Sequence, residues 1–147
     1  MIEIREMTME DYDGVYDLWT NTPGMGLNTT DDSREGIERY LRRNPSTSFV
    51  AVREGKIVGG ILAGHDGRRG MIYHTAVLPA YRRQGIGKRL VDRAMAALEG
   101  EGIHKVALVA FQSNALGNAF WWSLGFTERD DLVYRNKNIH FLVRVDT

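Results

Sequence analysis

The sequence has 147 residues, 43% of them hydrophobic, no cysteine, and a formal net charge of zero. This composition is typical of a soluble globular domain, and the lack of cysteine excludes disulfide bonds, a thiolate nucleophile and a zinc–thiolate site. The N-terminus has no apolar signal segment and no apolar run approaches the roughly 20 residues of a membrane span. We therefore expect one cytoplasmic domain over residues 1–147, without membrane contact and without a metal.

The charges are unevenly distributed along this neutral chain. Residues 1–50 hold ten Asp and Glu against five Lys and Arg, whereas residues 68–93 hold seven Lys and Arg against one Asp. A polyanionic ligand is therefore expected against the middle of the chain, and a cation against its first third. Nucleic acid is not expected, because the basic stretch is short.

The first third of the chain predicts one strand and two helices. Residues 2–7 alternate apolar and polar side chains, as a half-buried strand does. Thr8, with Asp11 three residues later, predicts the start of a helix. A loop rich in Gly, Pro, Asn and Ser follows, and a second helix over 34–44 ends at Asn44-Pro45.

The rest of the chain continues this alternation of strands and helices. Residues 48–78 predict three strands, with turns at Glu54-Gly55 and Asp66-Gly67. Next come a loop over 79–85, a helix over 88–102, a buried strand over 104–111, a short helix over 114–126, and strands over 132–136 and 139–145. This order predicts an α/β sandwich, with a largely antiparallel sheet of about seven strands flanked by about four helices.

The stretch YRRQGIGKRL, residues 81–90, places a glycine-containing basic loop directly before a helix. The first N–H groups of a helix have no partner within it and carry partial positive charge, so an anion is their natural ligand. Arg82, Arg83 and Lys88 add countercharge. The stretch is not a P-loop, because Arg89 follows Lys88, and it lacks the third glycine of a dinucleotide fingerprint, because Leu90 stands there. Taken alone, it is either a tight turn or a phosphate site.

Three motifs in order make the chain resemble the GNAT superfamily of acetyl-CoA-dependent N-acyltransferases from end to end. These are VLPAYR over residues 77–82, the spacing of Arg82, Gly85 and Gly87 in the pattern Q/R-x-x-G-x-G, and Asn114 followed by LGF over 124–126. The resemblance implies a GNAT-like fold with acetyl-CoA as co-substrate. The pantetheine arm would lie on a strand backbone and the pyrophosphate on the loop.

The resemblance also implies which residues contact coenzyme A. They are Ala76, Val77, Leu78, Arg82, Arg83, Gln84, Gly85, Ile86, Gly87, Lys88, Asn114 and Trp121. Two of these have alternative roles: Asn114 contacts pantetheine or caps its helix, and Trp121 lines the cleft or belongs to the core.

The residues that transfer protons are harder to assign. Many family members protonate the departing thiolate with a Tyr five residues before the Phe of the G-F pair, but here that position is Trp121, whose indole N–H is too weak an acid. The candidates are Tyr73, His74 and Tyr134. Alternation along the strand places Tyr73 on the face of Val77 and His74 on the opposite face. His74 is a base or a hydrogen-bonded core residue, and Tyr134 is an acid or a packing residue on a late strand.

The expected activity is transfer of an acetyl group to a primary amine of a small molecule or peptide, by direct attack in a ternary complex. Asp31, Asp32 and Glu35 favour a cationic amine, or else they complement a helix N-terminus. Arg68 and Arg69 favour an amine that carries a carboxylate. Two alternatives remain: an enzyme for another short acyl-CoA, or a non-catalytic acyl-CoA-binding or interaction module. Edge strands of this fold often pair between subunits, so a homodimer is a further expectation.

Overall fold

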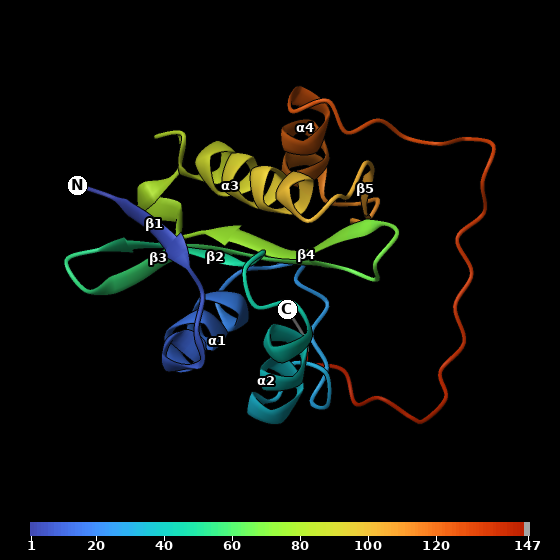
Figure 1. The fold of residues 1–147 in the computed structure, drawn as a ribbon, viewed down its shortest axis with the longest axis horizontal. Coiled ribbons are helices and arrows are strands. Elements are labelled where there is room, and N and C mark those ends of the chain that lie inside the picture. Colours follow the sequence, from blue (N-terminus) through green and yellow to red (C-terminus); the bar gives the residue numbers. More distant parts are fainter. Residues whose placement is uncertain (146–147) are drawn as a thin grey trace.

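The protein has three layers, a sheet between two pairs of helices (Figure 1), in a computed structural model that describes residues 1–145. The strands of the described part are β1 (Glu3–Glu6), β2 (Phe49–Arg53), β3 (Lys56–His65), β4 (Gly70–Val77) and β5 (Val106–Leu108). Its helices are α1 (Tyr12–Thr20), α2 (Arg34–Arg43), α3 (Ile86–Gly100) and α4 (Ala115–Ser123), with short 3-10 helices η1 (Met9–Asp11) and η2 (Pro79–Tyr81). The last two residues of the expected domain lie outside the described residues.

The strands form one sheet in the order β1-β2-β3-β4-β5. Neighbouring strands are antiparallel except β4 and β5, which are parallel. The predicted α/β class, the largely antiparallel sheet and the four flanking helices are confirmed.

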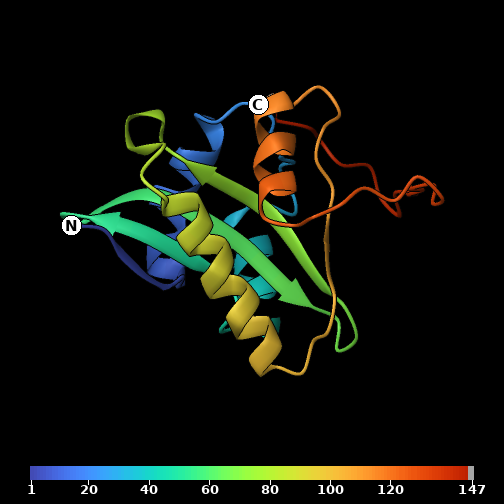
Figure 2. The ribbon, with the colours of Figure 1, turned by 90° about the horizontal axis from the view of Figure 1, so that it is seen from above.

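Each face of the sheet buries its own apolar cluster. α3 lies across one face, with α4 beside it (Figure 2), and the periodic residues Leu90, Val91, Ala94 and Leu98 of α3 are at most 2% exposed. α1 and α2 cover the other face, where Trp19 and Ile37 pack with strand residues. Burial of each Val, Leu or Ile side chain among them contributes about 1.5–3 kcal/mol to stability. No helix among the described residues is long and apolar enough to cross a membrane.

Local signals fix the ends of several elements. The N–H of Thr8 donates to Asp11 Oδ2 (2.9 Å), and the Arg5 guanidinium donates to both oxygens of the same carboxylate, at 2.8 and 2.9 Å. Burial favours the neutral form of Asp11, but these hydrogen bonds hold its pKa below the ordinary value. Ser33 Oγ accepts the N–H of Gly36 (3.0 Å) and so caps α2 at the predicted start.

The strands predicted over 132–136 and 139–145 are wrong. Within the described residues, the segment 127–145 contains no strand and runs outside the body of the protein (Figure 1). It returns to the loop before α2, where the N–H of Thr29 donates to the carbonyl of Val143 (2.9 Å). Alternating side chains predict an extended backbone, but a strand also needs a pairing partner.

The last strand of the sheet, β5, is shorter than expected. It covers only Val106–Leu108 of the strand predicted over 104–111.

Candidate active site

The loop between β4 and α3 presents unused backbone N–H groups. Arg83 and Gly85 adopt left-handed conformations, with φ of 63° and 78°. The first backbone hydrogen bond of α3 joins the N–H of Arg89 to the carbonyl of Gly85 (3.0 Å), so the helix uses none of the N–H groups of residues 86–88. Gly85 supplies no side-chain cap. This geometry fits an anion at the start of α3.

The polar side chains of this loop point to solvent. Arg83, Gln84 and Lys88 are exposed, and Lys88 Nζ pairs with Asp92 (2.7 Å). Arg82 folds back, so that its Nε donates to the carbonyl of Val77 (3.0 Å). Ile86, the first residue of α3, has a buried side chain, so only its backbone is available to a ligand.

Gly87 has a packing role that sequence reasoning missed. A Cβ at this position would lie 3.1 Å from Cζ of Phe120, tighter than ordinary contacts. The absence of a side chain therefore lets α4 approach the first turn of α3.

β4 and β5 separate beside this loop. They pair at Gly70 with Val106, Met71 with Ala107 and Ile72 with Leu108, and the described pairing ends there. Beyond that point, β4 continues to pair with β3 as far as Val77. Residues 73–77, which include the buried Ala76, therefore have an edge on the β5 side to which an extended ligand can add as a strand. Leu78 already donates its N–H to Val58 (2.9 Å).

A β-bulge interrupts β4 in the same region. Ile61 of β3 pairs with Thr75 and Ala63 with Ile72, so Tyr73 and His74 together occupy the place opposite one β3 residue. The predicted strict alternation is wrong here, because both side chains turn to the side of α1 and α2. The Tyr73 ring lies 5.9 Å from that of Tyr40 in α2, and the His74 ring lies 4.8 Å from that of Trp19 in α1.

Tyr73 and His74 line a cavity of about 530 Å³ between β4, α2 and the loop before α2. Its charged side chains are of both signs: Asp31, Asp32, Glu35, Arg39 and Arg43. The expected acidic residues are therefore present, but the cations come from α2. Arg68 and Arg69 do not line the cavity; their N–H groups close a turn on Asp66.

His74 is paired with an acid from the loop before α2. Its Nε2 lies 2.7 Å from Asp32 Oδ1, and the two side chains are only 12% and 5% exposed. The N–H of Asn28 donates to the other oxygen of Asp32 (2.9 Å), and the Tyr12 hydroxyl donates to its carbonyl (2.6 Å). Sequence reasoning missed this pair, because the two residues are 42 positions apart and no local pattern links them.

The tyrosines of the cavity are neutral phenols at physiological pH. Burial raises the pKa of Tyr40. Burial also raises the pKa of Tyr73, with further contributions from the nearby Tyr134 phenol and Asp31 carboxylate. Tyr134 itself is 68% exposed on the segment 127–145, not on a strand as predicted. Tyr134 is not among the residues that line the cavity.

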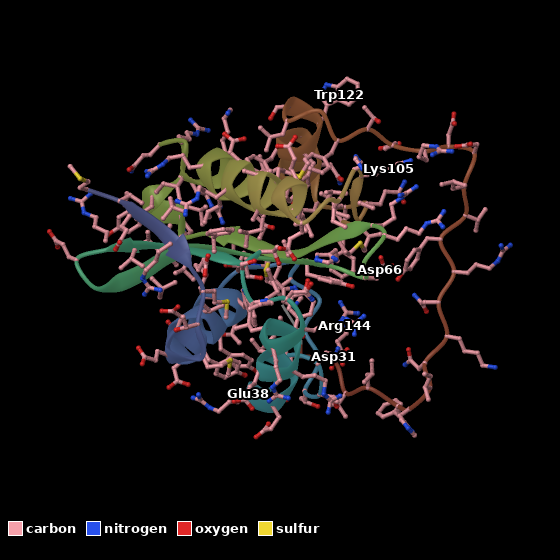
Figure 3. The ribbon with its side chains drawn as sticks, in the orientation of Figure 1. Asp31, Glu38, Asp66, Lys105, Trp122 and Arg144 are labelled. Carbon is pink, nitrogen blue, oxygen red and sulfur yellow. The ribbon has the colours of Figure 1, made fainter. Side chains whose placement is uncertain are left out.

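Asn114 and Trp121 lie on α4. The Asn114 side chain accepts the N–H of Gly117 (3.0 Å) and caps the helix. Trp121 is half-buried between Phe120 and Phe126, with ring centroids 5.0 and 5.2 Å apart, whereas Trp122 points away from the protein (Figure 3). Contact of either Asn114 or Trp121 with coenzyme A stays a prediction.

A sheet that opens beside a glycine-containing basic loop, with a charged cavity across the strand, fits the class of coenzyme A-dependent acyltransferases. The family model described as the Acetyltransferase (GNAT) family matches residues 12–126, and the chain belongs to this family.

Curated relatives and solved structures agree with this assignment. The acetyltransferase SG1711 of Sodalis glossinidius is 30% identical over 138 residues, 94% of this chain and 96% of the relative. The PaiA N-acetyltransferase of Thermoplasma acidophilum, solved with coenzyme A, superposes with a TM-score of 0.76 at 18% identity, covering 100% of this chain and 99% of that one. The aminoglycoside N-acetyltransferase AAC(6')-Iy, solved with a bisubstrate analogue, gives 0.70 at 19% identity over 94% and 99% of the two chains. At these identities the two structures establish a shared fold.

Proposed function

We propose that this protein is a cytoplasmic, single-domain N-acetyltransferase that transfers the acetyl group of acetyl-CoA to a primary amine of a small molecule or peptide. One observation carries the proposal: within the described residues, the second half of β4 has an unpaired edge next to a loop with unused backbone N–H groups on one side, and a charged cavity on the other. Two substrates can therefore meet at one strand, as direct transfer in a ternary complex requires. Because the chain has no cysteine, no acetyl-cysteine intermediate is available.

The donor side is proposed to bind acetyl-CoA mainly through backbone atoms. The backbone of Ala76, Val77 and Leu78 would lie along the pantetheine arm, and the N–H groups from Arg83 to Lys88 would bind the pyrophosphate. Arg82, Gln84 and Gly85 belong to this loop, and Asn114 and Trp121 would add contacts to coenzyme A from the region of α4. Acetyl-CoA supplies the activated acyl group, and the chain holds it in place.

The acceptor side must move two protons. When the amine nitrogen bonds to the acetyl carbon and the C–S bond breaks, the substrate ammonium gives up one proton to a base, and the sulfur receives one. The candidates are His74 and Tyr73, which line the cavity, and Tyr134 on the segment 127–145. The phenol hydroxyls of Tyr73 and Tyr134 can donate a proton to sulfur, and a backbone N–H near Val77 can stabilise the oxyanion without any side chain.

The cavity favours an amine that carries additional polar or charged groups. Asp31 and Glu35 offer partners to a cation, whereas Arg39 and Arg43 offer partners to a carboxylate. An aminoglycoside, a polyamine and a peptide N-terminus are the substrates to test first.

Trp121 in place of the usual Tyr favours a second candidate function, a non-catalytic acyl-CoA-binding module. Comparison of the turnover rates with acetyl-CoA and with longer acyl-CoA esters shows which acyl group the protein transfers.

The proposal is tested first by the melting temperature with and without acetyl-CoA. A ligand at about 100 times its dissociation constant adds about 2.7 kcal/mol, which is several degrees for a domain of this size. Gly85→Glu places a negative charge in the phosphate site and should abolish the shift. Gly55→Glu is the matched control, because both glycines have φ of 78° and nothing within 4 Å of an added Cβ, but Gly55 lies in the β2–β3 turn.

Each result has a definite meaning. A shift in the wild type and in Gly55→Glu, but not in Gly85→Glu, supports the loop as the coenzyme A site. If the wild type does not shift at millimolar acetyl-CoA, the proposed function is overturned. A shift followed by turnover of an amine separates the enzyme from the binding module.

A further inference from the structure

We propose that His74 is the base that deprotonates the substrate amine and that Asp32 positions its imidazole. The inference rests on the proposed function, because it assigns a role within the same site. It selects one of the three proton-transfer candidates on the basis of a contact that only the folded chain brings together.

The hydrogen bond between the two side chains determines which imidazole nitrogen is basic. Asp32 Oδ1 lies 2.7 Å from His74 Nε2. A carboxylate only accepts hydrogen bonds, so Nε2 carries a hydrogen, and in the neutral imidazole Nδ1 then keeps its lone pair. Among the described residues, no side chain or backbone group forms a hydrogen bond with Nδ1. This nitrogen is therefore available to a ligand in the cavity that His74 lines.

The neighbours of the pair hold it in one orientation. Asp32 is bound at its second oxygen by the N–H of Asn28 (2.9 Å) and at its carbonyl by the Tyr12 hydroxyl (2.6 Å). On the other side, the Trp19 ring packs edge-on against the imidazole at 4.8 Å, with an interplanar angle of 69°. A base held in this way needs little reorganisation before it acts.

The bulge places this base beside the strand edge that is proposed to bind the donor. His74 belongs to residues 73–77, whose pairing with β5 has ended. Without the extra residue, strict alternation would not turn both Tyr73 and His74 toward the cavity. Asp31 and Glu35 line the same cavity and can bind the ammonium, while Arg39 and Arg43 add positive charge from α2.

The proton balance of the step is simple. A primary ammonium loses two hydrogens on becoming an amide: Nδ1 of His74 takes one and later releases it to solvent, and the departing sulfur takes the other. Asp32 accepts the hydrogen bond from Nε2–H and keeps the imidazole in place, so it acts through His74 and does not touch the reacting atoms.

A second histidine–carboxylate pair provides matched controls. His65 Nε2 lies 3.2 Å from Glu101 Oε1, with side chains 20% and 46% exposed. This pair is at the far end of β3 and does not line the cavity. His65→Gln and Glu101→Gln therefore repeat the same chemical changes away from the site.

The first test is kinetic and uses a panel of spermidine, kanamycin and a short peptide with a free N-terminus. His74→Gln should lower kcat by about 100-fold or more, and Asp32→Asn by about tenfold, because one tenfold step corresponds to about 1.4 kcal/mol of lost positioning. The KM for acetyl-CoA and the acetyl-CoA-induced shift in melting temperature should stay unchanged, as should kcat in both controls. A kcat for His74→Gln within threefold of the wild type overturns the base assignment.

The second test needs no amine substrate. The ¹⁵N NMR shifts of the wild-type imidazole should show a single neutral tautomer, with hydrogen on Nε2, and Asp32→Asn should abolish this preference. A mixture of tautomers in the wild type overturns the pair, whether or not an amine is acetylated. Failure of the proposed function appears separately, as the lack of an acetyl-CoA-induced shift in melting temperature.

Discussion

The donor and acceptor sides of β4 are built in opposite ways. The proposed donor side is an exposed loop that offers backbone N–H groups, together with a strand edge that is unpaired within the described residues. The acceptor side is a cavity whose binding groups are side chains, including the buried pair of Asp32 and His74. A backbone site depends on chain conformation and tolerates many side chains, whereas a side-chain site changes with every substitution. One strand can therefore combine a constant donor with an acceptor that is particular to this chain.

The largest effect is expected behind the acceptor side, at Gly64 of β3. A Cβ there would lie 2.5 Å from the Tyr40 hydroxyl oxygen and 2.6 Å from Cγ of Asn44. Gly64→Ala should therefore lower the free energy of unfolding by about 1–3 kcal/mol through overpacking, and displace Tyr40 from the cavity wall.

Gly60→Ala on the same strand is the control, because its Cβ would meet nothing closer than 3.7 Å. Chemical denaturation measures both variants. Equal stability of Gly64→Ala and Gly60→Ala would show that Tyr40 and Asn44 can move to accommodate the added methyl group. The acceptor side would then be less rigid than its packing indicates.

A smaller effect is expected on proton transfer to sulfur. Tyr134→Phe should lower kcat at least about tenfold, about 1.4 kcal/mol, with little change in acetyl-CoA affinity, because only the acidic hydroxyl is removed. Steady-state kinetics measures this effect. An unchanged kcat would exclude Tyr134, and Tyr73→Phe then tests the remaining phenol.

The smallest effect is expected at the rim of the donor loop. Arg83→Gln should weaken acetyl-CoA binding only a few-fold at low salt, since an exposed ion pair contributes up to about 1 kcal/mol. The loss should shrink as ionic strength rises, and kcat should not change. Calorimetric titration at two salt concentrations measures it, with Arg53→Gln, an exposed Arg at the end of β2, as control. Loss of binding as complete as in Gly85→Glu would mean that side chains dominate the donor side as well.

The two sides also differed in how well the sequence predicted them. The donor loop could be recognised because its residues are contiguous and its glycines and helix start follow local rules. The pair of Asp32 and His74 could not, because it depends on a contact across 42 positions and on a bulge that breaks the alternation used to assign faces. The C-terminal strands were wrong for a related reason. Residues such as Tyr134 and Phe141 follow an alternating pattern, but pairing depends on an edge elsewhere in the fold.

The bulge at Tyr73 and His74 has an evolutionary consequence. Because two residues share one place in the register, loss of either one would keep the strand pairs on both sides and leave the coenzyme-binding loop intact. The remaining side chain would then follow plain alternation, without the arrangement that turns both toward the cavity. If the proposed roles hold, the difference between a catalyst and a scaffold that only binds its donor is a single codon.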